Sequence, residues 1–578
     1  MRSPVFYRAF LILFLAALNT VLASCGGSAS SSGAVSNGAT DPGIALAQVR
    51  FMTPPMGWNS WNTFACNDTE AIIKSVADAI ASNGMAAAGY QYVTVDDCWV
   101  GGRNATTGQL YSNATTFPDG IQALAAYVHS KGLKFGLYTS AGTNTCAGLA
   151  HGTRPASYPP GVGAGSLGHE AVDAQTFANW GVDYIKMDYC GGNLSAFPAM
   201  RAGIAATGRT MYLSINPYSA NTTLTTNFAA DGTLYVPAYA DMSRISQDIS
   251  AKFTSVTSII DTSAADAAWA VPGYFNDMDM LEVGNGMTAD QDTAHFAMWA
   301  MMSSGLNAGN DVRSQSAATQ ALLTNSAIIA VNQDPLALQA VLDTPDSSAT
   351  LQVWTKPLSA NGTRAVALLN RGSTAAPITV NFANLGLGGP VQATNLVNGA
   401  SLGTVTQSLT QTVPATGVVL VKLAGSDPVA VNGPLAPQGW IWSTVQSGTV
   451  AVKAANGVSP PVGATAAGAV VVHGSSYIDG ITVNAPAQLV YRLNGRCTTF
   501  QSDIGLDAAA QGAGTVDYQV WADNVELYDS GLVTSATPVK TVRVSVAGRN
   551  SLRLVITDGQ NGVTNDVADW ADPWLYCS

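Results

Sequence analysis

The stretch Val182-Asp-Tyr-Ile-Lys-Met-Asp188 is a short, mostly apolar run that ends in charged residues. Further apolar runs of strand length recur between Met56 and about Pro335. They are Tyr92 to Asp96, Leu133 to Tyr138, Met211 to Ile215 and Tyr274 to Asp277. Runs of this length, bounded by turn residues, are typical of strands buried in a parallel sheet.

Helical patterns separate these runs. Apolar residues lie three and four apart between Ile121 and Val128, and Gly132 follows as a stop signal. The same spacing occurs between Ile72 and Ile80, ahead of Gly84. A count of strand-helix units near eight predicts an α/β fold, a (β/α)₈ TIM barrel over residues 51–335. An open dinucleotide-binding sheet is disfavoured because no Gly-rich fingerprint follows the first strand.

Helical spacing disappears beyond Leu338, and strand-like runs replace it. The runs at 365–369, 378–382 and 418–423 predict an antiparallel β-sandwich over residues 336–424. Residues 425–437 contain three prolines and few apolar residues, so we interpret them as a linker. Strand patterns resume at Trp440 and include 516–521 and 551–556, which predicts a second C-terminal β-sandwich module over residues 438–578.

The N-terminal residues resemble an export signal. Arg2 and Arg8 precede an apolar run that is too short to span a membrane comfortably, and Leu22-Ala-Ser-Cys25 resembles a bacterial lipobox. We therefore expect a lipoprotein signal peptide over residues 1–24, lipidation of Cys25, and a Ser/Gly-rich tether over residues 25–50. The alternative is an ordinary signal peptide with a chance cysteine. Either route exports the chain, and the lipobox adds anchoring to a bacterial membrane, in the periplasm or at the cell surface.

The composition of the chain excludes some classes of binding partner. The net charge of −12 and the absence of Lys/Arg-rich runs argue against nucleic acid and against charge-driven adhesion to lipid, so the membrane contact we expect is the lipid anchor only. Without Cys25, six of the seven cysteines remain, which predicts three disulfides in an exported chain, with Cys497 and Cys577 closing the last domain. The five histidines have no ligand spacing, so no metal and no cofactor is expected.

Most predicted barrel strands end in polar groups, and the C-terminal ends of barrel strands are where active sites form. These groups include Asp96-Asp97, Lys186, Asp188 and Asn276-Asp-Met-Asp279. Lys186 and Asp188 lie two apart on one strand, so both side chains point to the same face, and the lysine favours an ionised aspartate. Two carboxyl groups across a bond are the requirement of glycoside hydrolysis. Each aspartate alone fits a helix N-cap equally well.

Aromatic residues near these strand ends offer faces for a sugar ring. They are Trp61, Trp99, Tyr138 and Trp299, each of which alone also suits a hydrophobic core.

Ordered motifs across residues 53–423 are similar to glycoside hydrolase family 27, the α-galactosidase or melibiase group. They are Thr53-Pro-Pro-Met-Gly-Trp-Asn-Ser-Trp61-Asn, Val95-Asp-Asp-Cys-Trp99, Gly132-Leu-Lys-Phe-Gly-Leu-Tyr138, Gly181-Val-Asp-Tyr-Ile-Lys-Met-Asp-Tyr-Cys190, Asn276-Asp-Met-Asp-Met-Leu-Glu-Val-Gly284 and Val331-Asn-Gln-Asp-Pro335.

The resemblance implies a retaining exo-α-galactosidase with Asp188 as nucleophile. Arg244-Ile-Ser-Gln-Asp248 resembles the segment that carries the acid/base, which implies that role for Asp248. The carboxyl groups of a retaining pair are expected roughly 5 to 6 Å apart, and a separation near 9 Å would contradict the assignment. The resemblance also implies the disulfides Cys66–Cys98 and Cys146–Cys190. Residues implied to line the sugar subsite are Trp61, Asp96, Asp97, Tyr138, Lys186, Arg244 and Asp279, with the Asp96-Asp97 pair reading O4 and O6.

One segment departs from the family pattern. Ser214-Ile-Asn-Pro-Tyr218 lacks the Cys and Glu of the usual Cys-Glu-Trp-like segment at the sugar's 2-position, and Phe275 and Met278 replace the usual Trp and Pro. Galactose remains the expected sugar because Asp96-Asp97 is retained. The alternatives are N-acetylgalactosamine, β-L-arabinopyranose or α-glucosyl substrates, or a non-catalytic glycan-binding lipoprotein.

Residues from about 438 to 578 are similar to an NPCBM-type carbohydrate-binding module. The matching segments are His473-Gly-Ser-Ser-Tyr477 before Gly480, Tyr491-Arg-Leu ahead of Thr499-Phe500, Asp503-Ile-Gly-Leu-Asp507 and Ala568-Asp-Trp570-Ala. This resemblance implies binding of a polysaccharide through the module. The alternative is a structural sandwich with a core Trp570.

Overall fold

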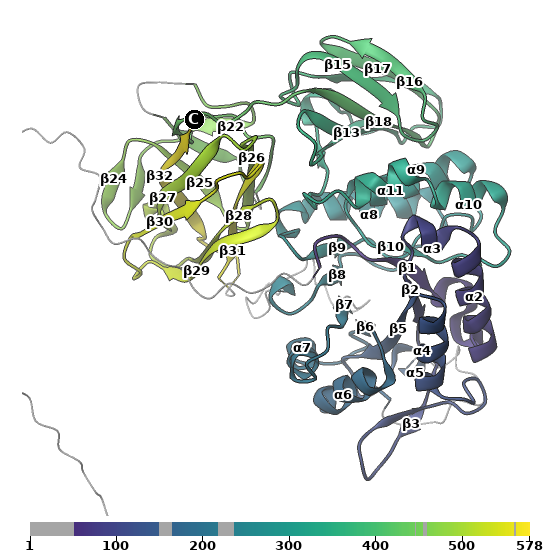
Figure 1. Cartoon of the computed structure of the whole chain (residues 1–578). Helices are drawn as coiled ribbons and strands as arrows, with labels where there is room; N and C mark the ends of the chain where they lie inside the picture. The colour runs from purple at the N-terminus through teal and green to yellow at the C-terminus, as the bar shows by residue number, and fades with distance from the viewer. Residues whose placement is uncertain (1–50, 150–163, 218–235, 446, 455–458, 560–561) are drawn as a thin grey trace, which may run out of the picture. The chain divides into compact units, whose positions relative to one another are not determined.

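A computed structural model describes residues 51–149, 164–217, 236–445, 447–454, 459–559 and 562–578 (Figure 1). The expected signal peptide, Cys25, the tether and Tyr218 lie outside the described residues. Within the described ranges, no helix combines the length and the apolar character that crossing a membrane requires.

The N-terminal part is a (β/α)₈ barrel with an eight-stranded parallel sheet, as predicted. The strand order is β10-β1-β2-β5-β6-β7-β8-β9. Leu281, four residues after β9, forms a parallel bridge to Ala308 of β10 and closes the ring. The strands are β1 (Met56–Asn59), β2 (Tyr92–Val95), β5 (Lys134–Ser140), β6 (Tyr184–Asp188), β7 (Tyr212–Asn216), β8 (Met242–Arg244), β9 (Phe275–Asp277) and β10 (Leu306–Ala308).

Helices follow these strands and cover the outside of the barrel (Figure 1). They include α2 (Glu70–Ser82), α4 (Ile121–Ser130), α6 (Glu170–Trp180), α7 (Ala196–Ala206), α8 (Phe253–Ala265), α9 (Ala289–Met301) and α11 (Ser326–Asn332). The α2 helix shows why the sequence forms them. The Thr69 hydroxyl caps its N-terminus by accepting from the Ile72 amide, and its apolar stripe, including Ile73, Val76 and Ile80, is buried.

A small antiparallel sandwich follows the barrel. Its larger sheet has the order β11-β12-β13-β18-β15-β16, and β14 pairs with β17 opposite it. Val353, Leu368 and Val380 belong to the core between the two layers. On the other face of β13, Ala365, Ala367 and Leu369 belong to the same hydrophobic core as the barrel. The strands are β11 (Val341–Leu342), β12 (Leu351–Pro357), β13 (Thr363–Asn370), β14 (Ala376–Asn381), β15 (Gly388–Asn395), β16 (Ser401–Val405), β17 (Ser408–Val413) and β18 (Gly417–Ser426).

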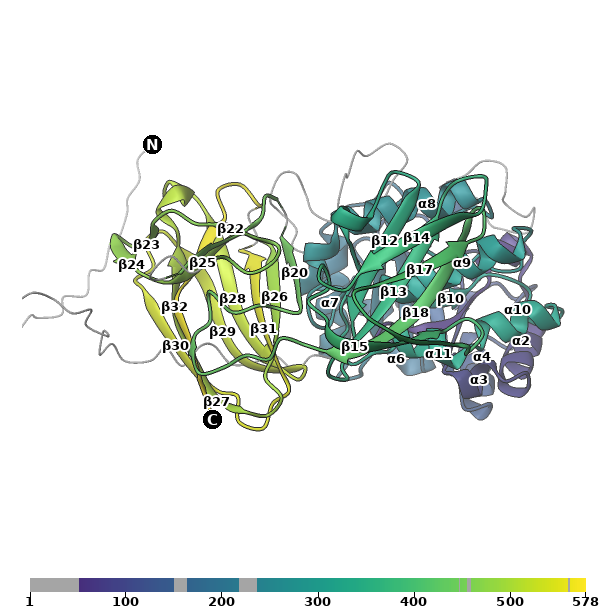
Figure 2. The ribbon, with the colours of Figure 1, turned by 90° about the horizontal axis from the view of Figure 1, so that it is seen from above.

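The C-terminal domain is a second sandwich (Figure 2). One sheet has the order β22-β21-β25-β32-β27-β30, and the other has the order β20-β26-β31-β28-β29. Phe500, Tyr518 and Trp570 pack edge to face in its core. The strands include β20 (Trp442–Val445), β21 (Val450–Lys453), β25 (Gly480–Asn484), β26 (Ala487–Arg492), β27 (Cys497–Leu506), β28 (Thr515–Ala522), β29 (Val525–Thr534), β30 (Lys540–Ser545), β31 (Ser551–Asp558) and β32 (Val567–Cys577).

The segment 425–437 connects the two sandwiches but is packed rather than free. Asp427 is buried and forms ion pairs with Arg364 of the middle sandwich at 2.6 Å and with Arg492 of the last domain at 3.0 Å. The short strand β19 (Gly433–Pro434) pairs with β32, and Leu435 is fully buried. A count of prolines does not reveal this packing, because the partners lie in two other domains.

Candidate active site

One cavity of about 340 Å³ lies at the C-terminal ends of the barrel strands. All nine residues predicted for catalysis or sugar binding line it. They are Trp61, Asp96, Asp97, Tyr138, Lys186, Asp188, Arg244, Asp248 and Asp279. The residues come from distant parts of the chain, and the parallel register brings them together because every strand ends at the same rim.

Lys186 forms the positive centre of the site. Its Nζ lies 2.8 Å from Oδ2 of Asp96 and 3.8 Å from Oδ2 of Asp188. Burial opposes the charge of Lys186, but Asp188 and Asp96 more than offset this and hold its pKa well above the ordinary value. The lysine is therefore a fixed cation between two carboxylates.

Asp188 is buried at the end of β6. Burial raises the pKa of Asp188 to about 7, with the charges of Asp96 and Asp248 acting in the same direction and those of Lys186 and Arg244 acting against it. Its Oδ1 accepts no hydrogen bond from any residue that the structure describes. Oδ1 itself is buried, and Asp188 lines the cavity.

Asp248 differs from Asp188 in its exposure to solvent and in the direction of its pKa shift. Its side chain is 84% exposed, and its Oδ1 lies 2.9 Å from Nη2 of Arg244. Partial removal from water raises the pKa of Asp248, but the charge and hydrogen bond of Arg244, together with the charge of Lys186, outweigh this and hold it below the ordinary value. The two carboxyl groups of the site therefore have clearly different proton affinities.

Arg244 also fixes Asp279. Its Nη2 lies 2.9 Å from Oδ2 of Asp279, and the same oxygen accepts from the Ile249 amide at 2.8 Å. Asp279 has φ of 74°, a conformation that is unfavourable for a residue with a side chain. Trp299 holds it there by donating its Nε1–H to the Asp279 carbonyl at 2.8 Å.

Asp97 is held by backbone amides on both oxygens. Cys98 N donates to Oδ1 at 2.6 Å and Ala147 N donates to Oδ2 at 2.7 Å. Burial raises the pKa of Asp97 to about 6, against these two hydrogen bonds. Its neighbour Asp96 accepts from Asn59 Nδ2 at 2.7 Å. The Asp96-Asp97 pair is therefore rigid before any ligand enters.

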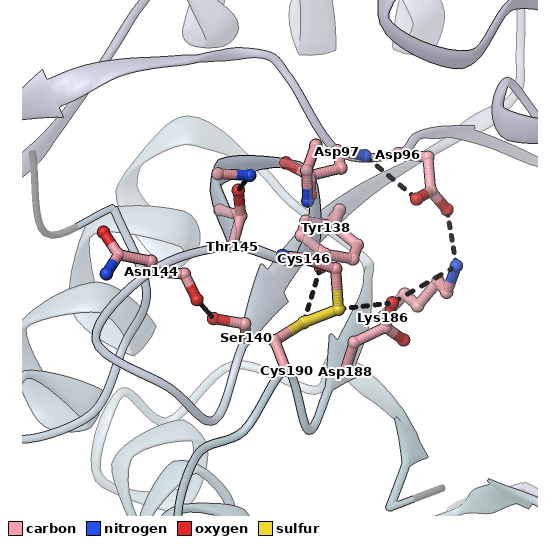
Figure 3. The surroundings of a disulfide bond; sticks show 12 residues. Asp96, Asp97, Tyr138, Ser140, Asn144, Thr145, Cys146, Lys186, Asp188 and Cys190 are labelled. Atoms are coloured by element: carbon pink, nitrogen blue, oxygen red, sulfur yellow. Dashed lines mark hydrogen bonds and ion pairs between the residues drawn. A yellow bond between two sulfur atoms is a disulfide. The ribbon is translucent and has the colours of Figure 1, made fainter. Parts of the chain in front are cut away.

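Disulfides join the cysteines in the three pairs that were expected, Cys66–Cys98, Cys146–Cys190 and Cys497–Cys577. Figure 3 shows the second of these beside Tyr138 and Asp188. The Tyr138 hydroxyl lies 3.2 Å from Cys190 Sγ and accepts from Cys146 N at 3.3 Å. The bridge thus ties the loop after β6 to the loop after β5. Three disulfides are typical of a protein that is exported to an oxidising compartment.

Two of the four aromatic residues suggested for sugar faces belong to the core instead. Trp99 and Trp299 are fully buried, and Trp99 donates to the Tyr138 carbonyl at 2.9 Å. They support the cavity wall from behind, while Trp61 and Tyr138 line the cavity. Sequence position alone did not separate the two pairs, because Trp299 lies in helix α9 and Trp99 follows β2, and burial of either ring depends on what packs against it.

Several other residues that line the cavity were not predicted individually as site residues, although Asn216 belongs to the segment placed at the sugar's 2-position. They are Asn62, Asn216, Gln247, Ile249 and Met280. Asn216 is the informative one, since it ends β7 in register with Asp188. Its position in Ser214-Ile-Asn216 after a predicted strand was the available signal. Ser214 lies deeper and lines a smaller cavity with Lys186 and Arg244.

In the described part of the chain, one group has metal-ligand spacing, formed by Cys146, Asp188 and Cys190. The two cysteines are joined as a disulfide, so they do not offer thiolates to a metal. The donor set at this position therefore does not fit a metal ion.

A (β/α)₈ barrel with a small cavity at its mouth, lined by several carboxylates and by aromatic residues, is typical of a glycoside hydrolase. The chain belongs to glycoside hydrolase family 27, and it is an enzyme of the α-galactosidase type. The family described as Alpha galactosidase A matches residues 53–334, the Alpha galactosidase C-terminal beta sandwich domain matches 348–423, and the NPCBM/NEW2 domain matches 435–576.

Individual relatives agree with this assignment. Alpha-galactosidase A of Cellvibrio japonicus is 39% identical over 64% of this chain and 92% of its own length. The crystal structure of alpha-galactosidase I from Mortierella vinacea superposes with a TM-score of 0.58 at 33% identity, over 66% of this chain and all of that chain. A family 27 β-L-arabinopyranosidase from Geobacillus stearothermophilus, in complex with arabinose, has a TM-score of 0.54 at 25% identity, over 65% and 98% of the two chains.

Proposed function

We propose that the protein is a retaining, exo-acting α-galactosidase in which Asp188 is the nucleophile and Asp248 is the acid/base. The observation that carries this proposal is that two carboxyl groups line one cavity at the mouth of the barrel. Asp188 lies beside Lys186, and Asp248 is held by Arg244. Double displacement requires two carboxyl groups on either side of the scissile bond.

In the first step, a carboxylate oxygen of Asp188 attacks the anomeric carbon, and the bond to the leaving oxygen breaks as Asp248 delivers its proton to that oxygen. The product is a β-linked glycosyl-enzyme. In the second step Asp248 takes a proton from water, and the water oxygen attacks the anomeric carbon from the opposite side. The bond to Asp188 breaks, and galactose leaves with its α-configuration retained.

The productive state carries a proton on Asp248 and none on Asp188, which is the reverse of the preference in the empty cavity. A bound sugar resolves this difference if its hydroxyls accept hydrogen bonds from Arg244. Competition for the guanidinium weakens its contact with Asp248, so the pKa of Asp248 rises. The attacking species is then the ionised carboxylate of Asp188, which Lys186 stabilises.

The small volume of the cavity supports exo action on a terminal sugar. A site of about 340 Å³ suits one sugar unit with its leaving group directed outward. The Asp96-Asp97 pair and Lys186 would bind O4 and O6, and Trp61 would cover the apolar face of the ring. These contacts to O4 and O6 support galactose as the substrate sugar.

The contact to the 2-position of the sugar is where this chain departs from the family pattern, so a different substrate specificity is the second candidate. Asn216, beside Asp188, offers a neutral amide where the family pattern has Cys-Glu-Trp. A changed 2-position would admit N-acetylgalactosamine. The similarity to a β-L-arabinopyranosidase bears on the 6-position instead, because that sugar lacks the C6 hydroxymethyl group. N-acetylgalactosaminides, α-glucosides and a catalytically silent glycan-binding role remain the other outcomes to be tested.

The decisive experiment compares the purified protein with its Asp188→Asn variant on p-nitrophenyl α-D-galactopyranoside. Three analogues run beside it, the α-N-acetylgalactosaminide, the β-L-arabinopyranoside and the α-glucoside. We expect turnover of the galactoside and a loss in the variant on the order of 10⁴-fold or more. Proton NMR of the first product should show the α-anomer. The β-anomer would contradict retention, and no turnover on all four substrates would favour the binding-protein alternative.

We further propose that the exported chain is anchored through lipidated Cys25 and that its C-terminal domain binds polysaccharide. Leu22-Ala-Ser-Cys25 supports the anchor. Expression with a Cys25→Ser substitution should release the protein from the membrane fraction, and mass spectrometry of the mature N-terminus should find the lipid on the unsubstituted chain. Unchanged membrane association of the variant would contradict this anchor.

A further inference from the structure

The outer face of the last sheet carries a pair of exposed aromatic rings. Trp574 and Tyr576 lie two residues apart on β32, with exposed fractions of 37% and 38%. Leu575 between them is fully buried, so the alternation of the strand places both rings on the outer face. The ring centroids are 6.3 Å apart and the ring planes are inclined at 46°. Of the described aromatic residues, only Tyr111, on the short strand β4 (Leu110–Ser112) of the barrel domain, is comparably exposed.

Polar side chains from the two neighbouring strands flank these rings. Gln501 of β27 lies opposite Trp574 and also opposite Arg543 of β30, and Thr499 lies opposite both Tyr576 and Ser545. The Arg543 guanidinium donates to Gln501 Oε1 and stands 5.0 Å from the centroid of the Tyr576 ring. Because the strands lie in the order β32-β27-β30, these outward side chains form one surface, with the aromatic rings on β32 and the hydrogen-bonding groups on β27 and β30.

We infer that this surface binds a single soluble glycan chain, an inference that rests on the polysaccharide binding proposed above for the C-terminal domain. The surface is formed by Trp574, Tyr576, Thr499, Gln501, Arg543 and Ser545. Sugar rings have an apolar C–H face and a periphery of hydroxyls, which match the aromatic rings and the amide, hydroxyl and guanidinium groups respectively. The surface carries one charge, that of Arg543, and this guanidinium is already engaged with Gln501 and the Tyr576 ring, so the ligand the surface fits is a neutral glycan.

The geometry favours this occupant over two others. Rings inclined at 46° do not make a flat platform, so they suit a twisted single chain rather than the planar surface of crystalline cellulose. A stable protein partner would need about 800 Å² on each side. Two partly exposed rings among small polar side chains offer much less apolar surface than that requires.

This site is separate from the catalytic cavity and has a different effect on the reaction. It raises the local concentration of a polymeric substrate through a second attachment point and does not alter the chemical step. It therefore predicts an advantage on polysaccharides and none on a small aryl galactoside. That difference also keeps its failure distinct from a failure of the proposed catalytic roles.

The test is affinity electrophoresis of the full chain carrying Asp188→Asn, in gels that contain guar galactomannan, larch arabinogalactan or soluble xylan. We expect at least one glycan to retard the protein. Trp574→Ala and Tyr576→Ala should each weaken binding about tenfold, and the double variant should migrate as it does without glycan. Unchanged thermal unfolding of the variants would establish that they remain folded.

Two substitutions serve as controls. Tyr111→Ala removes an exposed aromatic ring from the barrel, and His473→Asn alters a cavity of about 130 Å³ elsewhere on the last domain. Both control variants should still be retarded by the glycan. In a chain that retains Asp188, the Trp574→Ala/Tyr576→Ala double variant should hydrolyse p-nitrophenyl galactoside at the rate of the unsubstituted protein. Absence of retardation in all three glycans, its survival in the double variant, or its equal loss in either control would overturn the assignment.

Discussion

The ammonium group of Lys186 lies 3.8 Å from the carboxylate of Asp188, two residues further along the same barrel strand. Because side chains two apart share a face, strand β6 alone delivers both a carboxylate and its counter-ion to the cavity. The pKa of Asp188 is therefore the balance between burial, which raises it, and Lys186, which lowers it. The first two predictions follow from this balance and from its counterpart at Asp248.

Replacing Lys186 by Met should shift the pH dependence of catalysis. The nucleophile acts as the ionised form, so kcat/KM falls as pH drops through the pKa of Asp188, which is about 7. Without the ammonium group that pKa rises, and the acidic limb of the kcat/KM profile should move to higher pH. Lys134→Met is the matched control, because Lys134 is the exposed first residue of β5 and lies at the end of that strand away from the cavity. This substitution should leave the acidic limb of the kcat/KM profile in place. A shift toward lower pH in Lys186→Met would contradict this reading.

Replacing Asp248 by Ala should reduce turnover of aryl galactosides that have poor leaving groups by about 10²- to 10⁴-fold. Substrates whose leaving group needs no proton should lose much less in the first step. Azide, which attacks without base assistance, should restore turnover and yield the α-galactosyl azide, identified by NMR. Formation of the β-azide would assign Asp248 the role of nucleophile instead.

Removing the Cys146–Cys190 bridge by a double Ser substitution should lower both stability and activity. Loss of a disulfide typically costs about 2 to 5 kcal/mol, and this one also fixes the loop that follows Asp188. Thermal unfolding and kcat/KM on the aryl galactoside are the two measurements. The Cys497/Cys577 double variant is the control, since its bridge lies in the last domain and its loss should lower stability while leaving kcat/KM intact.

Replacing Asp427 by Asn should destabilise the chain by about 3 kcal/mol or more, because two buried guanidinium groups lose their shared counter-charge. Burial already lowers the pKa of Arg364, and Asp427 opposes that effect. Asp261→Asn breaks the ion pair with Arg371 on an exposed side chain and should cost less than about 1 kcal/mol. Chemical unfolding followed by tryptophan fluorescence would give the free energy of unfolding of the two variants. Equal losses in Asp427→Asn and Asp261→Asn would show that Asp427 is not a structural bridge.

Much of the fold could be read from the sequence, because the relevant signals are local. The barrel strands β2, β5, β6, β7 and β9 were each predicted to within about two residues, since an apolar run and its terminal turn residues are neighbours in the chain. The short strands β1, β8 and β10 gave no such signal. In β8, Met242-Ser-Arg244 has one apolar residue in three, and its place in the sheet comes from pairing with β7 and β9.

The sequence by itself determined which residues are available for chemistry. It placed Lys186 and Asp188 on one strand face and Asp96-Asp97 at the end of another, and its ordered motifs identified the family. Tertiary structure alone decided which groups meet. Lys186 contacts Asp96 across 90 residues, Trp99 and Trp299 turn into the core, and Asn216 lines the cavity next to Asp188. The physical reason is that strand and helix patterns are set by neighbours along the chain, whereas charge pairing, burial and the pKa of a carboxyl group depend on contacts made when the barrel closes.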